Sequence, residues 1–377
     1  MNRDRTDEWG VTYSANGRTM KFVNNRFNDC EHYVVPEGVV DMNVSFMFNG
    51  QKLRSIKLPS TLRRMDCNTF VDCPIEEIVI PEGVVKIPDF MCECCKELKR
   101  AVLPQTTKII GNGAFCNCKK LSEINMPDSI EDIGEHALSS CKALVNVKLP
   151  PKIERIQTHL FYCSGIETID IHKNITEIGY FAFWGCNSLK RLVIPEWVKH
   201  IEYGIVSAHE GFEGIECHAK GYHVENDALI CDENQELLCC WSRQKHYTVP
   251  ECVKRIAEMG GNPFVETITV KQPVELTTYD VFASNINLRN VDFQGGAFRI
   301  DHSGTFYNCP KLENDIATTV IEKPRGLGVG RRWEGGYQRI MRKLLKKMDI
   351  TTILIVVIFH KYIYVKIDQI VCALNTY

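Results

Sequence analysis

Residues 121–141 read LSEINMPDSIEDIGEHALSSC, and the pattern within this stretch decides the fold. Its first part alternates apolar and polar positions, as a short strand with one buried side does. Pro127 ends that strand, because proline cannot donate the next hydrogen bond of a sheet. After Gly134, one helical or 3₁₀ turn would bring Ala137, Leu138 and Cys141 to the same side. The stretch predicts a strand and a turn that bury too little apolar surface to fold alone.

The same pattern recurs along most of the chain. Its prolines are spaced by 23, 22, 23, 23, 23 and then 45 residues, and a cysteine precedes most of them by nine positions. The prolines are Pro36, Pro59, Pro81, Pro104, Pro127, Pro150 and Pro195. Two markers in phase over so many units predict stacked coils of about 23 residues that share one core.

Laid over one another, the units give the signature I-P-x-x-[IV]-x-x-I-[GP]-x-x-A-F-x-x-C, which ends for example at Phe183 and Cys186. This signature resembles the BspA-type leucine-rich repeat family over residues 10–315. The resemblance implies a leucine-rich-repeat solenoid of the α/β horseshoe type, with mostly short parallel β-strands and helical or 3₁₀ turns. It also implies a non-enzymatic interaction protein, with adhesion or host interaction as the role of similar proteins.

Two irregular stretches resemble the hairpin-like unit of this family, in which two strands and an Asp- and Asn-rich turn interrupt the coils. One runs from Tyr222 to Ile256, and the other begins at Val11, where it would cap the open end of the core. We therefore predict a repeat domain over 10–315 and a basic C-terminal tail over 316–377. Within the domain we expect a capping unit (10–35), regular repeats (36–194), an irregular hairpin-like unit (195–249) and resumed repeats (250–315).

The composition argues against several protein classes. A formal net charge of -2 disfavours a nucleic-acid partner, which a basic excess would indicate. No stretch reaches about 18 uninterrupted apolar residues, so we do not expect several membrane spans. The first residues are charged and polar, without the apolar segment of a secretory signal, which predicts a cytoplasmic protein. The family resemblance makes an extracellular or cell-surface location the alternative.

The chain contains 18 cysteines, many of which mark the repeat. Equivalent positions of adjacent coils lie about 4.8 Å apart, which predicts a ladder of small buried thiols without disulfides. The ladder would hold Cys73, Cys95, Cys118, Cys141, Cys163 and Cys186. Four cysteines outside the ladder can be exposed thiols: Cys94, Cys116, Cys239 and Cys240. The C-x-C and C-C spacings fit zinc poorly, because zinc sites use paired C-x₂₋₄-C motifs.

The densest group of histidines lies in the irregular unit, at His209, His218 and His223. Their spacing matches no catalytic motif, since nucleophilic catalysis needs a nucleophile, a base and a third orienting group. A polar surface loop is the favoured interpretation. The alternative is a thiol- or metal-dependent enzyme that uses residues 209–240. We predict no catalytic residue, no cofactor and no metal ligand.

The strand edges of such a solenoid line one broad face, and its outward residues form the natural binding surface. Their charges mostly alternate in sign from coil to coil, so neighbouring residues attract each other. The surface is either a ladder that stabilises itself or the binding face for a protein or glycan ligand, and it lacks the continuous basic stripe typical of nucleic-acid binding. The candidate partner-binding residues are Arg54, Glu77, Lys99, Arg100, Glu123, Asn146, Glu167, Thr168, Lys190 and Arg191.

The tail has a different composition, with 11 basic and 4 acidic residues from Val320 to Tyr377. Residues 337–348 are predicted to form a basic amphipathic helix. This helix either caps the last coil or contacts a membrane surface, which would make the protein an adhesin-type or membrane-peripheral scaffold. The contacting residues would be Arg339, Arg342, Lys343, Lys346 and Lys347. The apolar run 350–359 is too short to span a bilayer.

Overall fold

The computed structural model describes residues 3–45, 48, 52–278, 280–299, 305–312 and 320–322. The chain divides into a unit over Met1–Lys323 and a unit over Pro324–Tyr377. The predicted helix over 337–348, its basic residues and the apolar run 350–359 lie outside the described residues. Within the described part of the chain, no helix is long and apolar enough to cross a membrane.

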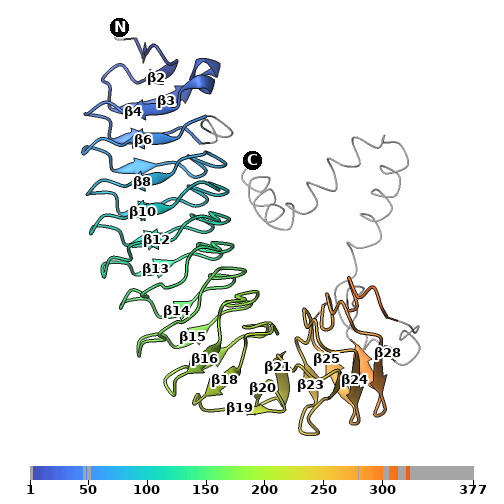
Figure 1. Ribbon diagram of the computed structural model, residues 1–377. Helices are drawn as coiled ribbons and strands as arrows, with labels where there is room; N and C mark the ends of the chain where they lie inside the picture. Colours follow the sequence, from blue (N-terminus) through green and yellow to red (C-terminus); the bar gives the residue numbers. More distant parts are fainter. Residues whose placement is uncertain are drawn as a thin grey trace, which may run out of the picture. The chain divides into compact units, whose positions relative to one another are not determined.

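The first strand of each coil is the alternating segment before the proline position. In most coils it pairs in parallel with its equivalent in the next coil (Figure 1). Glu77 therefore lies opposite Arg100, which lies opposite Glu123. Asn146 and Thr168 continue this pairing as an isolated bridge. The strands are β4 (His32–Val34), β6 (Ser55–Lys57), β8 (Glu77–Val79), β10 (Arg100–Val102), β12 (Glu123–Ile124), β16 (Arg191–Ile194), β18 (Gly214–Cys217), β22 (His246–Thr248), β24 (Thr267–Val270) and β26 (Asn290–Phe293).

A second, shorter strand follows the proline turn in most coils, and the sequence pattern did not predict it. It buries the last isoleucine of the I-x-x-I segment, such as Ile110 or Ile133, against the core. These strands also pair in parallel, so two sides of each coil are β-structure. They are β5 (Asp41–Met42), β7 (Arg64–Met65), β9 (Lys86–Ile87), β11 (Ile109–Ile110), β13 (Asp132–Ile133), β14 (Arg155–Ile156), β15 (Glu177–Ile178), β17 (His200–Ile201), β23 (Arg255–Ile256), β25 (Val274–Leu276), β27 (Ala297–Arg299) and β28 (Val320–Glu322).

The turns that carry the A-F-x-x-C segment are not helical, so this detail of the prediction was wrong. Among the described residues, a 3₁₀ helix occurs in the first unit, η1 (Asn25–Asp29), and the repeated segments form turns instead. The reason is that every second N–H group of these turns bonds to the next coil. The Cys92 N–H donates to the Ala114 carbonyl at 2.8 Å, and the Phe115 N–H donates to the Ala137 carbonyl at 3.0 Å. A helix would need those donors for bonds within its own turn.

The inward side chains of both sheets and of the turns fill the core. They form two clusters, one that begins at Val11 and extends to Trp241, and one from Ala228 to Phe293. Equivalent side chains of adjacent coils pack on each other, as Phe161 and Phe183 do with ring centroids 5.7 Å apart. Each coil therefore completes its core only through its neighbours, as the repeat pattern predicts.

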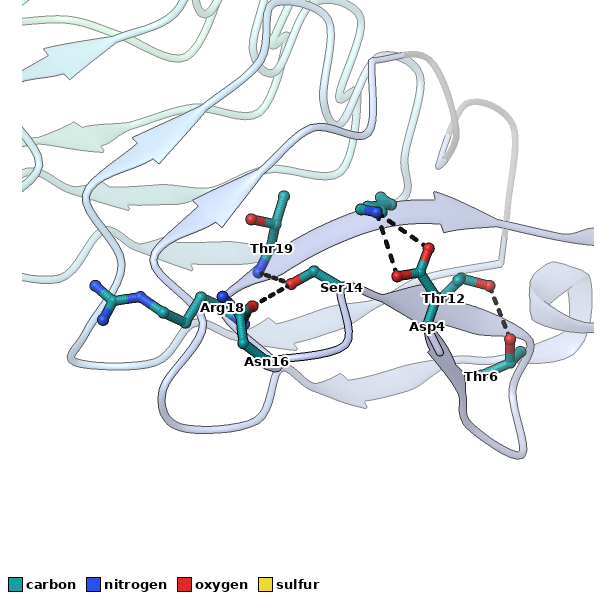
Figure 2. A network of polar contacts seen from close by, with 8 residues as sticks. Asp4, Thr6, Thr12, Ser14, Asn16, Arg18 and Thr19 are labelled. Atoms are coloured by element: carbon teal, nitrogen blue, oxygen red, sulfur yellow. Dashed lines mark hydrogen bonds and ion pairs between the residues drawn. The ribbon is translucent and has the colours of Figure 1, made fainter. Parts of the chain in front are cut away.

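An antiparallel sheet precedes the first coil. Its third strand pairs in parallel with β5, which joins it to the stack. Figure 2 shows the polar contacts that hold it: the Thr6 and Thr12 hydroxyls lie 3.0 Å apart, and Ser14 donates to Asn16 at 2.7 Å. The exposed outer strand gives the core a polar end layer, as the end of a solenoid requires. The strands are β1 (Arg5–Thr6), β2 (Val11–Tyr13) and β3 (Thr19–Val23).

Three antiparallel strands interrupt the coils in the irregular unit: β19 (Tyr222–Glu225), β20 (Ala228–Cys231) and β21 (Glu236–Cys240). Asn226 and Asp227 form the first turn with φ angles of 46° and 57°, which suits a tight hairpin. Side chains of β20 and β21 enter both core clusters: Leu229 packs in the first, whereas Ile230 and Leu237 pack in the second. We call β20 and β21 the hairpin wall, because they separate the two clusters.

Candidate functional site

All ten residues predicted to bind a partner are exposed. Glu77, Arg100 and Glu123 lie side by side on β8, β10 and β12, and Asn146 and Thr168 are paired in the same way further along. Arg191 starts β16. The other four, Arg54, Lys99, Glu167 and Lys190, each directly precede one of these outward positions. We call the outward side of the first strands the strand face.

Many charges of the strand face are paired between adjacent coils. The Lys99 Nζ lies 2.7 Å from Glu76, and this hydrogen bond lowers the pKa of the Glu76 carboxyl. Arg100 contacts Glu77 and lies 3.4 Å from Glu123, so one guanidinium bridges three coils. The alternating signs therefore give ion pairs between coils, as the sequence pattern predicts, and a partner that binds here meets many charges that already have a neighbour.

Exposed valines form a second feature of the strand face, and the sequence reasoning missed them. Val34, Val79 and Val193 are exposed by 63%, 51% and 43%. Each stands two positions after an outward residue of the same strand, so it lies on the same face of the sheet. The sequence signal for them is the middle residue of the I-x-I segment, which is valine in these units and polar in most of the others. The strand face thus combines paired charges with accessible aliphatic groups.

The cysteine ladder is confirmed at Cys73, Cys95, Cys118, Cys141 and Cys186, which are all buried. Each thiol donates to a backbone carbonyl of the preceding coil, for example Cys186 to the Phe161 carbonyl at 3.0 Å. The prediction was wrong for Cys163, which is half-buried, while the neighbouring Ser164 occupies the ladder. Cys163 instead takes the left-handed position before the ladder, with a φ of 57°, as Ser140 and Gly185 do in the adjacent coils.

The cysteines outside the ladder are not the exposed thiols that the sequence suggested. Cys239 and Cys240 are buried within the hairpin wall, and Cys94 and Cys116 are half-buried. Burial raises the pKa of Cys116 and of Cys240 to about 12. Because the thiolate is the nucleophilic form, burial makes Cys116 and Cys240 poor nucleophiles at neutral pH.

A cavity of about 290 Å³ lies beside the turns on the two sides of the hairpin wall. The buried Glu258 accepts a hydrogen bond from the Gly260 N–H at 2.5 Å, and its burial raises the pKa of the carboxyl well above the usual range. Gly261 has a φ of 63° and lies under the Trp184 ring. The sequence reasoning missed this cavity. The Gly260-Gly261 pair could have indicated it, because the equivalent turns of other coils carry larger residues. The lining residues include His159, Phe181, Trp184, Glu258 and Asp280.

The three histidines of the irregular unit have different surroundings. His209 packs on Phe212, with ring centroids 5.5 Å apart, and His218 lies 2.8 Å from a Glu216 carboxylate oxygen. His223 lies on β19, and its Nε2 is 4.0 Å from the Cys252 Sγ. The thiol that lies near His223 is therefore that of Cys252, which is outside the region 209–240 considered from the sequence. The sequence reasoning missed it, because the two residues are 29 positions apart.

The family model of the BspA type leucine rich repeat region matches this chain in six copies, over residues 21–106, 85–213 and 239–322. These ranges cover more than half of the chain. The chain belongs to the BspA-type leucine-rich repeat family. Membership confirms the resemblance that the signature predicted, and with it a leucine-rich-repeat solenoid, a scaffold suited to interactions.

Several solved structures resemble this BspA-type protein. A leucine-rich cell surface protein from Faecalibacterium prausnitzii is 20% identical and matches with a TM-score of 0.56, over 82% of this chain and 81% of that chain. The pneumococcal vaccine antigen PcpA is 13% identical, with a TM-score of 0.38, over 83% of this chain and 80% of that chain. No curated protein matches. The first similarity supports the fold.

Proposed function

We propose that this BspA-type repeat protein is a non-catalytic scaffold that binds a protein partner through its strand face. The observation that carries the proposal is the strand face itself, where exposed valines of separate coils, Val34, Val79 and Val193, lie among charges that are paired between coils. The family and the fold support an interaction role in general. The ten predicted residues, eight charged and two polar, would form the polar part of the binding surface.

The chemistry of the strand face favours a protein over a glycan. Val34, Val79 and Val193 gain from contact with apolar groups, because burying them removes aliphatic surface from water. The charged rows would add specificity, since a partner with the wrong charge pattern leaves buried charges unpaired. The expected partner therefore presents aliphatic side chains flanked by charges of both signs along an extended surface.

The test compares the strand face with a matched exposed valine on another side of the coil. Val85 is exposed by 46% and directly precedes β9 in the second sheet. The wild-type chain is used to capture proteins from extracts of its own organism or of a cell that it contacts. The V79D/V193D double variant should no longer capture these proteins. The V85D variant should retain them. Quantitative mass spectrometry measures both, and equal capture by all three chains would refute the proposal.

We also propose that the protein acts at a cell surface, which was the alternative in the sequence interpretation. The support is the similarity to the Faecalibacterium prausnitzii protein, which is described as a cell surface protein. Intact cells that produce the chain should expose it to added protease and to antibodies. Detection only after lysis would favour the cytoplasmic location instead.

A further inference from the structure

Three side chains with metal-binding atoms meet beside the hairpin. His223 and Glu225 are two positions apart on β19, so both point to the same face of the strand. Cys252 follows the first strand β22 and approaches them from the next coil. The Cys252 Sγ lies 3.4 Å from the Glu225 Oε2 and 4.0 Å from the His223 Nε2. The Glu225 Oε2 and the His223 Nε2 are 3.7 Å apart.

These separations suit a tetrahedral metal ion. Zinc binds nitrogen and oxygen at about 2.0–2.2 Å and sulfur at about 2.3 Å, which places neighbouring ligand atoms about 3.4–3.6 Å apart. Small side-chain rotations would bring all three distances into this range. The three atoms already form one face of a tetrahedron, and side-chain exposures of 41% for His223 and 51% for Glu225 leave access for a fourth ligand from water.

A fourth residue holds the histidine in the orientation that a metal requires. Asp232, which follows β20, accepts a hydrogen bond from the His223 Nδ1. That contact places the proton on Nδ1 and leaves the lone pair of Nε2 facing Glu225 and Cys252. Carboxylate–histidine–metal arrangements of this kind are the usual second layer of zinc sites. A chance cluster of exposed acidic residues has no reason to orient an imidazole in this way.

The local charge also calls for a cation. Two carboxylates, Glu225 and Asp232, flank the imidazole and the thiol. A divalent ion would neutralise the carboxylates and bind the thiolate directly.

We propose that His223, Glu225 and Cys252 bind a zinc ion, with Asp232 as the residue that positions His223. The mixed nitrogen, oxygen and sulfur ligands favour zinc over magnesium or calcium, which prefer oxygen alone. The ion would tie β19 of the hairpin to the coil that contains Cys252. It thus adds a metal crosslink at the place where the repeat is interrupted, separate from the strand face.

The experiment uses the full chain, freed of metal with a chelator and then titrated with zinc in competition with a chromophoric chelator. One high-affinity equivalent is expected in the wild type. Cobalt should give a thiolate-to-metal charge-transfer absorption at the same site. H223A and C252S should lose both signals, whereas D232N should weaken zinc binding by about 10–100-fold.

Matched controls separate this site from other thiols and histidines of the chain. C231S removes a half-buried thiol of the same hairpin, and H218A removes an exposed histidine of the same unit. Both should keep the zinc equivalent and the cobalt absorption. Zinc should also raise the melting temperature of the wild type and not that of C252S, with both melting alike in chelator. Failure of the wild type to bind zinc, or unchanged binding by C252S, would overturn the proposal.

Discussion

Glu258 is a buried carboxyl whose ionisation should affect stability. Its raised pKa means that the native chain keeps a proton that the unfolded chain releases above about pH 4.3. Its contribution to stability is therefore full below that pH and is lost as the pH rises toward the native pKa. E258Q should be at least as stable as the wild type at pH 7.

Urea denaturation followed by circular dichroism between pH 4 and pH 8 measures this difference. The advantage of E258Q should shrink toward pH 4, where Glu258 is protonated in both states. E251Q changes an exposed carboxyl and is the control, with no expected change in stability. An E258Q variant whose stability falls further below that of the wild type as the pH rises would show that the carboxylate is favourable where it lies.

The cysteine ladder makes a second prediction for single residues. The Cys141 thiol donates to the buried Phe115 carbonyl at 3.2 Å. C141S keeps a donor at this place, as Ser164 does naturally, whereas C141A leaves the carbonyl without that donor. Denaturation should find C141A less stable than C141S by about 1 kcal/mol. Equal stabilities would mean that the sulfur acts through its volume alone.

At the scale of single residues, the sequence pattern located the buried positions better than the polar contacts. The period placed Cys141 and Cys186 correctly because burial follows the repeat. It misplaced Cys163, because a one-residue shift within a turn changes which side chain enters the core. The proximity of His223 to Cys252 depends on how the hairpin folds back beside the next coil. The spacing of residues along the sequence does not predict that arrangement.

The second strands are the elements whose loss should be most damaging. Ile178 on β15 is completely buried and contacts the core through both neighbouring coils. I178D would place a charge there, so we expect loss of cooperative thermal unfolding. I178V removes one methylene and should cost about 0.5–1.5 kcal/mol. A normal melting curve for I178D would contradict the observed burial.

The first strands were predictable from sequence, and the turns were not. The alternation before each proline identifies β8 and β10, because burial on one side of a strand leaves a period of two. The turn after Gly134 has the spacing of a short helix, but every second N–H group in it bonds to the following coil. Helical spacing over so few residues does not show whether the backbone N–H groups bond within their own turn or to the adjacent coil.

The two core clusters make a prediction for the whole repeat unit. Ile256 belongs to the second cluster and Ile133 to the first. I256A should accelerate amide hydrogen exchange mainly over residues 246–293, whereas I133A should do so mainly over residues 55–217. The reason is that stability in a repeat protein spreads through contacts between neighbouring coils. Exchange that rises uniformly in both variants would mean that the hairpin wall transmits unfolding fully.

The hairpin wall has a consequence for how such a gene can change. A duplication or deletion of one whole coil keeps every inward position in phase, because each strand pairs with the equivalent strand of the next coil. With a wall that both cores share, coils can be gained before it or after it without altering the packing on the other side. Recombination can therefore lengthen the two arrays separately, and the hairpin is the segment that every length variant must retain.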